Sequence, residues 1–164
     1  MQDTDTRTVQ SPSKTAELDP ILDAFGFKVD LVSAAMVTGR LLVTDRYCQP
    51  FKGMHGGLSA LIAESLASIG AHMASNFQRV AGIQLSVNNF LNATAGDVVF
   101  ARATPVHAGK TIQVWEVHLW RIKGESSMEE EALLASSRVT ILSNMPVPEN
   151  SKNADIALRK YAKL

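Results

Sequence analysis

One segment constrains the fold of this chain more than any other. Residues 55–75 read HGGLSALIAESLASIGAHMAS, and their only ionisable side chains are those of His55, Glu64 and His72. Apolar and small residues occupy every side of the helix that this segment predicts. A helix that is apolar all round is normally buried, and a sheet that curls around it is the simplest way to bury it. The sequence therefore predicts one long helix enclosed by a sheet.

The rest of the ordered chain predicts strands. Apolar residues that alternate with polar ones, or short apolar runs between turn residues, predict strands over residues 27–32, 36–44, 83–87, 98–106, 111–122 and 133–142. We expect an α+β domain with a curled antiparallel sheet of five to six strands. The apolar phase within 111–122 changes, which predicts a bulge near Val114-Trp115 and a sheet covered on both faces. An oligomer would supply the outer cover.

The length of 164 residues fits one domain with short extensions. Residues 1–18 are polar and predict a flexible leader, and order is expected to begin near Asp19-Pro20, where a helix starts. The domain is predicted over 19–148, followed by a tail at 149–164.

Composition excludes several classes of protein. Sixteen Lys and Arg against sixteen Asp and Glu leave no net charge, so binding to nucleic acid is not expected. No apolar run has the length of about 20 residues that a membrane helix needs without also containing a Glu and two His. The single Cys48 cannot form an internal disulfide. We therefore expect neither a membrane span nor a disulfide scaffold.

Glu64 stands out because it is the only acidic residue in an apolar helix. Ionising a carboxylate in such surroundings is costly unless the group is hydrogen-bonded or wet. Ser68 lies one turn further on, and the small Ala60 and Ala67 leave room beside the carboxylate. We predict a buried acid with space for a substrate; the alternative is that Glu64 lies on a solvated strip.

The start of the same helix offers hydrogen-bond donors. Gly56 and Gly57 present backbone N–H groups at the positive end of the helix dipole, where an oxyanion would be stabilised. Paired glycines also occur simply to permit close packing. His55 precedes them, and Gln49 in the preceding loop carries an amide that can orient a water or a carbonyl, although such an amide is often merely solvated.

His55 and Glu64 cannot act on one substrate atom within one chain. Nine residues of helix place them about 13.5 Å apart along the axis and roughly half a turn apart around it. If two copies pack with their long helices antiparallel, the helix start of one lies opposite Glu64 of the other. The sequence thus predicts two equivalent sites at a dimer interface.

These residues resemble a known family. The run Gln49-Pro-Phe-Lys-Gly-Met-His55-Gly56-Gly57, with Glu64 nine residues after the histidine, is similar to the hot dog fold acyl-CoA thioesterases of the 4-hydroxybenzoyl-CoA and phenylacetyl-CoA type. The resemblance covers roughly residues 20–145. More narrowly, the helix sequence and VAGIQLSVN resemble plant peroxisomal thioesterases that act on 1,4-dihydroxy-2-naphthoyl-CoA.

The resemblance implies roles for individual residues. Glu64 would be the nucleophile or the general base, and the family mechanisms leave this open. The Gly56 N–H of the other subunit would receive the oxyanion, His55 and Gln49 would position the thioester or the water, and Ser68 would support the carboxylate.

The resemblance also implies a substrate and an assembly. The substrate would be an acyl-CoA, with no other cofactor and no metal, and the assembly a homotetramer made of two dimers. Candidates for contact with the substrate or with CoA are Gly57, Asn89, Gly109, Lys110 and Arg121. Asn88-Asn89 departs from the Asn followed by His or an aromatic residue that many relatives have, which bears on the acyl pocket.

The last three residues, Ala162-Lys163-Leu164, match the pattern of a peroxisomal targeting tripeptide. They predict a peroxisomal location and binding to the peroxisomal import receptor. Hydrolysis of 1,4-dihydroxy-2-naphthoyl-CoA in phylloquinone (vitamin K1) biosynthesis is the leading hypothesis. The alternatives are a thioesterase for other aromatic or medium-chain fatty acyl-CoAs, a dehydratase of 3-hydroxyacyl thioesters, and a non-catalytic acyl-CoA-binding protein.

Overall fold

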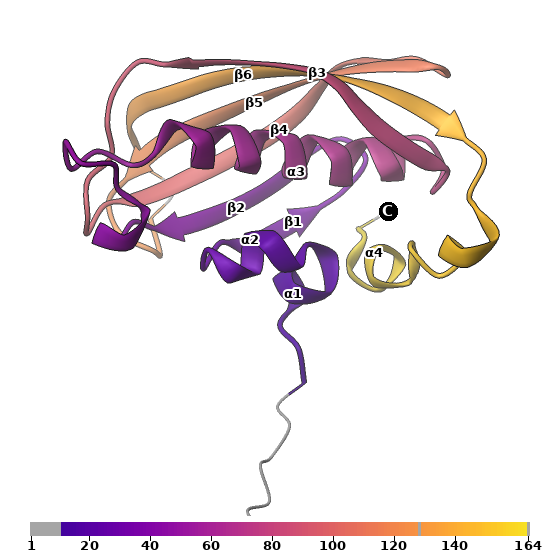
Figure 1. Cartoon of the computed structure of the whole chain (residues 1–164), viewed down its shortest axis with the longest axis horizontal. Helices are drawn as coiled ribbons and strands as arrows, with labels where there is room; N and C mark the ends of the chain where they lie inside the picture. The colour runs from indigo at the N-terminus through magenta and orange to yellow at the C-terminus, as the bar shows by residue number, and fades with distance from the viewer. Residues whose placement is uncertain (1–10, 128, 164) are drawn as a thin grey trace, which may run out of the picture.

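A six-stranded antiparallel sheet curls around one long helix (Figure 1). The computed structural model describes residues 11–127 and 129–163. The strands follow the order β1-β2-β4-β5-β6-β3 across the sheet. Their bounds are β1 Lys28–Val32, β2 Val37–Leu42, β3 Arg79–Asn89, β4 Val98–Ala108, β5 Ile112–Ile122 and β6 Glu130–Met145. The predicted α+β architecture is confirmed.

The long helix α3, Gly56–Ala74, lies against the concave face of the sheet. Its residues Ile62, Ala63, Leu66 and Ala67 are fully buried. Close approach at its C-terminal half depends on Gly70, because a β-carbon there would lie 2.4 Å from the Trp115 ring. The predicted helix over 55–75 is therefore confirmed to within one residue at each end.

Gln113 is a buried polar side chain whose hydrogen bonds link the sheet to this helix. Its amide nitrogen donates to the Ala71 carbonyl at 3.2 Å, and its oxygen accepts from the Trp115 indole at 2.8 Å. Burial of an amide is costly unless both ends are paired, and here both are. The pair fixes β5 against α3 near the helix C-terminus.

A bulge is present near Val114-Trp115, but the prediction placed it in the wrong strand. Val114 and Trp115 pair continuously with Thr140 and Val139, and the extra residue is Val106 in β4, opposite them. The apolar phase in β5 changes because Ile112 and Val114 lie on the outer face, while Trp115 and the residues that alternate with it point to the core. The outer face is partly exposed in this single chain.

Three short helices lie beneath the open side of the sheet: α1 Lys14–Leu18, α2 Pro20–Ala24 and α4 Ile156–Tyr161. Asp19 caps α2 as expected, with its carboxylate accepting from the N–H groups of Ile21 and Leu22 at 3.0 and 3.1 Å. Order begins earlier than predicted, however. Thr15 of α1 is buried and accepts from the Val29 N–H at 2.9 Å, so part of the predicted leader is structured.

The N-terminal and C-terminal helices hold each other. Lys160 of α4 donates to both carboxylate oxygens of Glu17 in α1, at 2.9 and 3.0 Å, and the Tyr161 hydroxyl donates to the same group at 3.0 Å. Lys163 donates its backbone N–H to the Val32 carbonyl. Of the predicted leader, residues 1–10 lie outside the described residues, as does Leu164 at the other end.

Strand β3 forms one edge of the sheet. Among the described residues it pairs only with β6. Large apolar side chains on and just after it are exposed, namely Ile83 at 57%, Phe90 at 56% and Leu91 at 54%. A long edge strand with exposed apolar side chains is usually covered or paired in a native protein. No helix among residues 11–127 and 129–163 is long and apolar enough to span a membrane.

Candidate active site

His55 caps helix α3 with its own ring. Its Nδ1 accepts from the Gly57 N–H at 2.9 Å, which satisfies one of the donors left open at a helix start. Because Nδ1 accepts, a neutral imidazole carries its proton on Nε2, which remains able to donate to a substrate. The Gly57 N–H is thereby occupied, whereas the Gly56 N–H has no hydrogen-bond partner in the part of the chain that the structure describes.

Gln49 lies in the loop before this helix. Its side-chain oxygen accepts from the Phe51 N–H at 2.5 Å, and its backbone closes a tight turn with Lys52 and Gly53. Lys52 adopts a left-handed conformation with a φ of 69°. With the oxygen engaged, the amide NH₂ of Gln49 is the end that is left to donate to a water or a carbonyl.

Gln49, Gly56 and Asn89 come together around a small cavity of about 140 Å³. A β-carbon on Gly56 would lie 3.3 Å from the side-chain nitrogen of Asn89, so the end of β3 lies directly beside the start of α3. His55 and Gly57 open instead onto a neighbouring cavity of about 360 Å³, which Tyr47 also lines. The sequence-predicted donors therefore cluster at the helix start.

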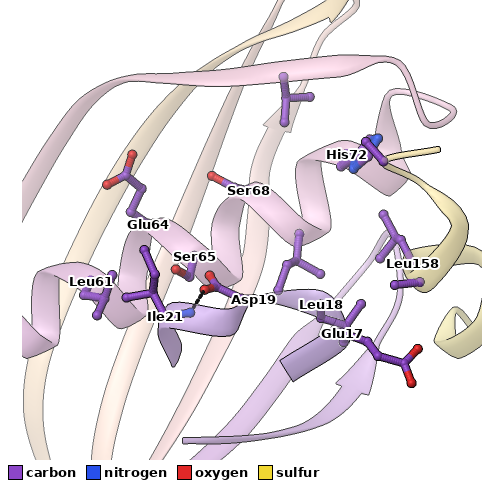
Figure 2. Close-up of a pocket in the computed structure, with 14 residues that line it drawn as sticks. Glu17, Leu18, Asp19, Ile21, Leu61, Glu64, Ser65, Ser68, His72 and Leu158 are labelled. Carbon is purple, nitrogen blue, oxygen red and sulfur yellow. Dashed lines mark hydrogen bonds between the residues drawn. The ribbon is translucent and has the colours of Figure 1, made fainter. Parts of the chain in front are cut away.

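Glu64 lies elsewhere, on a cavity of about 410 Å³ that also includes Ser68 (Figure 2). The prediction that Glu64 is buried is wrong for the single chain, because its side chain is exposed. The sequence pattern shows that the neighbours of Glu64 on the helix are apolar, but it does not show the open cavity in front of its side chain. Gly82 on β3 closes one side, since a β-carbon there would lie 3.0 Å from Oε1 of Glu64.

The walls of this cavity come from both ends of the chain. Leu18 and Ile21 of the N-terminal helices face α3 across it, and Leu158 of α4 lies at its far end (Figure 2). Ala157 of α4 also lines the cavity. Polar groups are Glu64, Ser65, Ser68 and His72 of α3, with Glu17 and Asp19. Eight apolar and six polar residues therefore line the cavity, and apolar walls with convergent polar groups are usual in a small-molecule site.

The residues considered for CoA do not form one site within a chain. Lys110 precedes β5 and Arg121 lies near its end, so about 30 Å of strand separates them. Arg121 also pairs with Glu131 at 3.4 Å and Asp97 at 4.0 Å. Gly109 has a structural reason to be glycine, because a β-carbon there would lie 2.6 Å from the carbonyl oxygen of Ile112. Lys110 is exposed.

Known proteins with similar sequences and structures identify the family of this chain. A family model described as the thioesterase superfamily matches residues 51–128, which include Gly56, Glu64 and Gly82. The chain is 48% identical over 143 residues to 1,4-dihydroxy-2-naphthoyl-CoA thioesterase 2 of Arabidopsis thaliana, covering 87% of this chain and 91% of that protein. This chain belongs to the thioesterase superfamily.

Other relatives agree. This thioesterase is 34% identical over 120 residues to 1,4-dihydroxy-2-naphthoyl-CoA hydrolase of Listeria monocytogenes, covering 73% of this chain and 91% of that one. Among solved structures, a Haemophilus influenzae thioesterase matches with a TM-score of 0.65 at 26% identity, covering 79% of this chain and 85% of that one. The predicted hot dog fold, in which the sheet wraps the central helix, is confirmed.

Two residues of the site escaped the sequence analysis. Gly82 was noted only as part of a resembling stretch, and nothing in a lone strand glycine shows that it faces a carboxylate. His72 was noted only as ionisable, yet it lines the same cavity as Glu64. Its spacing of eight residues from Glu64 carried a signal, because two helical turns plus about 80° still lie within the width of one helix face.

Proposed function

We propose that this thioesterase hydrolyses 1,4-dihydroxy-2-naphthoyl-CoA to the free acid and CoA. The observation that carries the proposal is the position of Glu64, a carboxylate in an open cavity with apolar and polar walls, beside the edge strand β3, whose outer edge has no partner strand in the described part of the chain. The substrate is supported by the names of two relatives, from Arabidopsis thaliana and Listeria monocytogenes. Water is the only co-substrate that the reaction needs.

The site requires two subunits. Along α3, Gly56 and Glu64 are about 12 Å apart, and they open onto different cavities. Strand β3 runs past both, with Gly82 at Glu64 and Asn89 at Gly56. Ile83 is the extra residue of a bulge between Gly82 and Gln84, so Gly82 and Asn89 share one face of β3. In a two-fold antiparallel pairing of β3 with the β3 of a second copy, centred on Ser86 and keeping this bulge, Gly82 lies opposite Asn89 of the partner subunit.

This pairing completes the machinery. Residues directly opposite in an antiparallel pair point to the same face, so the partner subunit's Asn89 brings the partner subunit's Gly56 toward Glu64. The free Gly56 N–H then lies across the interface from the carboxylate, where it can receive the oxyanion of the thioester. The same contact covers the exposed edge of β3.

The chemistry follows two routes that share these groups. In one, Glu64 takes a proton from water as the water oxygen adds to the thioester carbonyl; the C–S bond then breaks and the CoA thiolate regains a proton. In the other, the carboxylate itself adds, CoA leaves, and water hydrolyses the mixed anhydride. In both, the Gly56 N–H stabilises the negative oxygen, and His55 Nε2 and the Gln49 amide donate to the carbonyl or the water.

Glu64→Ala tests the carboxylate. Hydrolysis, measured as free CoA thiol, should fall by at least a hundredfold with an unchanged Tm and oligomeric state, since either route loses its reacting group. Glu64→Gln is the matched control for shape. A variant that keeps its turnover would contradict the assigned role.

The substrate is tested by comparing the rates of hydrolysis of 1,4-dihydroxy-2-naphthoyl-, benzoyl-, phenylacetyl- and medium-chain fatty acyl-CoA.

Subunit mixing tests the shared site. Glu64→Ala lacks the carboxylate and His55→Ala lacks a donor at the helix start, so each alone should be nearly inactive. After co-refolding at equal amounts, half of the dimers are mixed, and each mixed dimer has one intact site. About a quarter of the wild-type activity should therefore return. A site built within one chain would show no recovery.

Location, pathway and higher assembly form a separate part of the proposal. We propose that Ala162-Lys163-Leu164 binds the peroxisomal import receptor, that the product enters phylloquinone biosynthesis, that dimers pair into a homotetramer, and that Lys110 contacts the CoA phosphates. Lys163 is bound to the Val32 carbonyl, so receptor binding would require this segment to detach. A fluorescent fusion with and without Leu164 tests the location, and light scattering tests the tetramer.

A further inference from the structure

The cavity that contains Glu64 continues along α3 to His72, a residue with no part in the hydrolysis described above. Eight residues separate the two, which is about 12 Å along the helix axis. Figure 2 shows Glu64 and His72 at opposite ends of the pocket, with Ser68 between them on the same helix. An acyl group with fused rings that is held by its carbonyl at Glu64 has room to extend along this pocket toward His72.

The hydrogen bonding of His72 fixes its tautomer. Its Nε2 lies 3.2 Å from the Phe77 carbonyl oxygen. A carbonyl can only accept, so Nε2 carries the proton and Nδ1 of the neutral ring has a free lone pair. Within residues 11–127 and 129–163, Nδ1 has no hydrogen-bond partner. The half-buried ring thus presents an acceptor that the protein leaves unused.

The turn after α3 holds the ring in place. Asn76 and Phe77 both adopt left-handed conformations, with φ of 54° and 60°; this is common for an asparagine just after a helix but rare for a phenylalanine. This geometry directs the Phe77 carbonyl to His72, while the Phe77 N–H donates to the His72 carbonyl at 2.9 Å. Backbone strain of this kind persists where the surrounding structure enforces it, often at functional sites.

Helix α4 supports the same turn from outside. The Arg159 guanidinium lies 3.9 Å from the centre of the Phe77 ring, and that ring meets the imidazole of His72 edge-on with their centres 6.2 Å apart. The Phe77 side chain is therefore held between Arg159 and His72. This contact restricts the orientation of the imidazole, so its acceptor is preorganised.

Resting on the proposed function, we propose that His72 is a specificity-determining residue whose Nδ1 accepts a hydrogen bond from a ring hydroxyl of the acyl group. The walls near it are apolar, including Ile69, Val80 and Leu158, and they suit an aromatic ring. The volume of about 410 Å³ lies within the usual range for small-molecule sites. The site therefore selects hydroxylated over unhydroxylated aromatic acyl groups.

The experiment compares two substrates that differ in one hydroxyl, 1,4-dihydroxy-2-naphthoyl-CoA and 1-hydroxy-2-naphthoyl-CoA. In the wild type, kcat/KM should favour the dihydroxy substrate by about tenfold, the effect of one hydrogen bond. His72→Phe, which keeps the ring shape but not the bond to Phe77, should remove this preference through a larger loss of kcat/KM on the dihydroxy than on the monohydroxy substrate. His72→Gln can donate to Phe77 and still present an oxygen, so it should restore part of the preference.

His107→Phe serves as the matched control, because His107 is exposed on β4 and is not among the residues that line the cavity. Equal losses on both substrates in His72→Phe would overturn the proposal and indicate a structural role. An unchanged preference would overturn it as well, while leaving the proposed function intact. A wild-type enzyme that hydrolyses fatty acyl-CoA but neither naphthoyl thioester would contradict both the role of His72 and the proposed substrate.

Discussion

Gly82→Ala is expected to slow hydrolysis through a displacement of Glu64 that the structure defines. The new β-carbon would lie 3.0 Å from Oε1 of Glu64. Close carbon–oxygen contacts in proteins lie at about 3.3–3.6 Å, so the carboxylate must retreat by roughly 0.3–0.6 Å. A misplacement of about 1 Å costs roughly a hundredfold in rate, so this shift predicts a loss of roughly four- to sixteen-fold in kcat.

The same substitution should not weaken the fold. The backbone of Gly82 has no positive φ, and an alanine adopts strand geometry freely. Loss of a glycine from the unfolded chain raises the free energy of unfolding by about 0.4–1 kcal/mol, partly offset by the new contact. Steady-state kinetics and thermal unfolding measure the two effects, with Ser86→Ala on the same strand as control. An unchanged kcat, or a kcat that falls only together with Tm, would refute the reasoning.

Two further predictions concern helix ends. His55→Ala removes the acceptor for the Gly57 N–H and should lower the free energy of unfolding by about 1 kcal/mol in denaturant titrations, whereas His55→Asn should keep the cap but not the activity. The hydrogen bonds from Lys160, then Tyr161, lower the pKa of Glu17. The stabilisation that Glu17 gives to the docking of α4 is therefore complete above the ordinary carboxyl pKa, and it is lost as the pH falls through the lowered pKa of folded Glu17. The hydrogen-exchange rates of the α4 amides should rise in that acidic range. In Glu17→Gln they should be raised already at neutral pH.

The main elements were predictable because their signals are local. The apolar pattern of residues 55–75 gave α3 to within one residue at each end, and the alternation in residues 111–122 gave β5. Asp19 followed by Pro20 gave the start of α2, since an acceptor at the cap and a proline in the first turn act within a few residues. Such signals need no knowledge of distant parts of the chain.

The errors have the opposite character. Helix α1 is held by Thr15 bonding to the Val29 backbone, a contact across fourteen residues that polar composition does not reveal. The bulge lies at Val106 because strand pairing, rather than the phase of β5, decides which strand contains the extra residue. The site clusters Gln49 with Asn89, forty residues apart, through the crossing of β3 and α3.

The exposure of Glu64 was also missed because it depends on contacts between distant parts of the chain. It shows that an apolar helix pattern does not always indicate a helix buried by its own chain. Leu61 borders Glu64 on the open cavity and is only half-buried, so this side of α3 carries apolar surface that its own sheet does not cover. In the proposed dimer the partner subunit closes the edge at β3, and the acyl group fills the rest. The carboxylate then loses water only when substrate is present, which strengthens its interaction with the reacting carbonyl at the moment of reaction. Apolar residues that are covered by a ligand and a second subunit therefore give the same sequence pattern as apolar residues that are buried in the core of one chain.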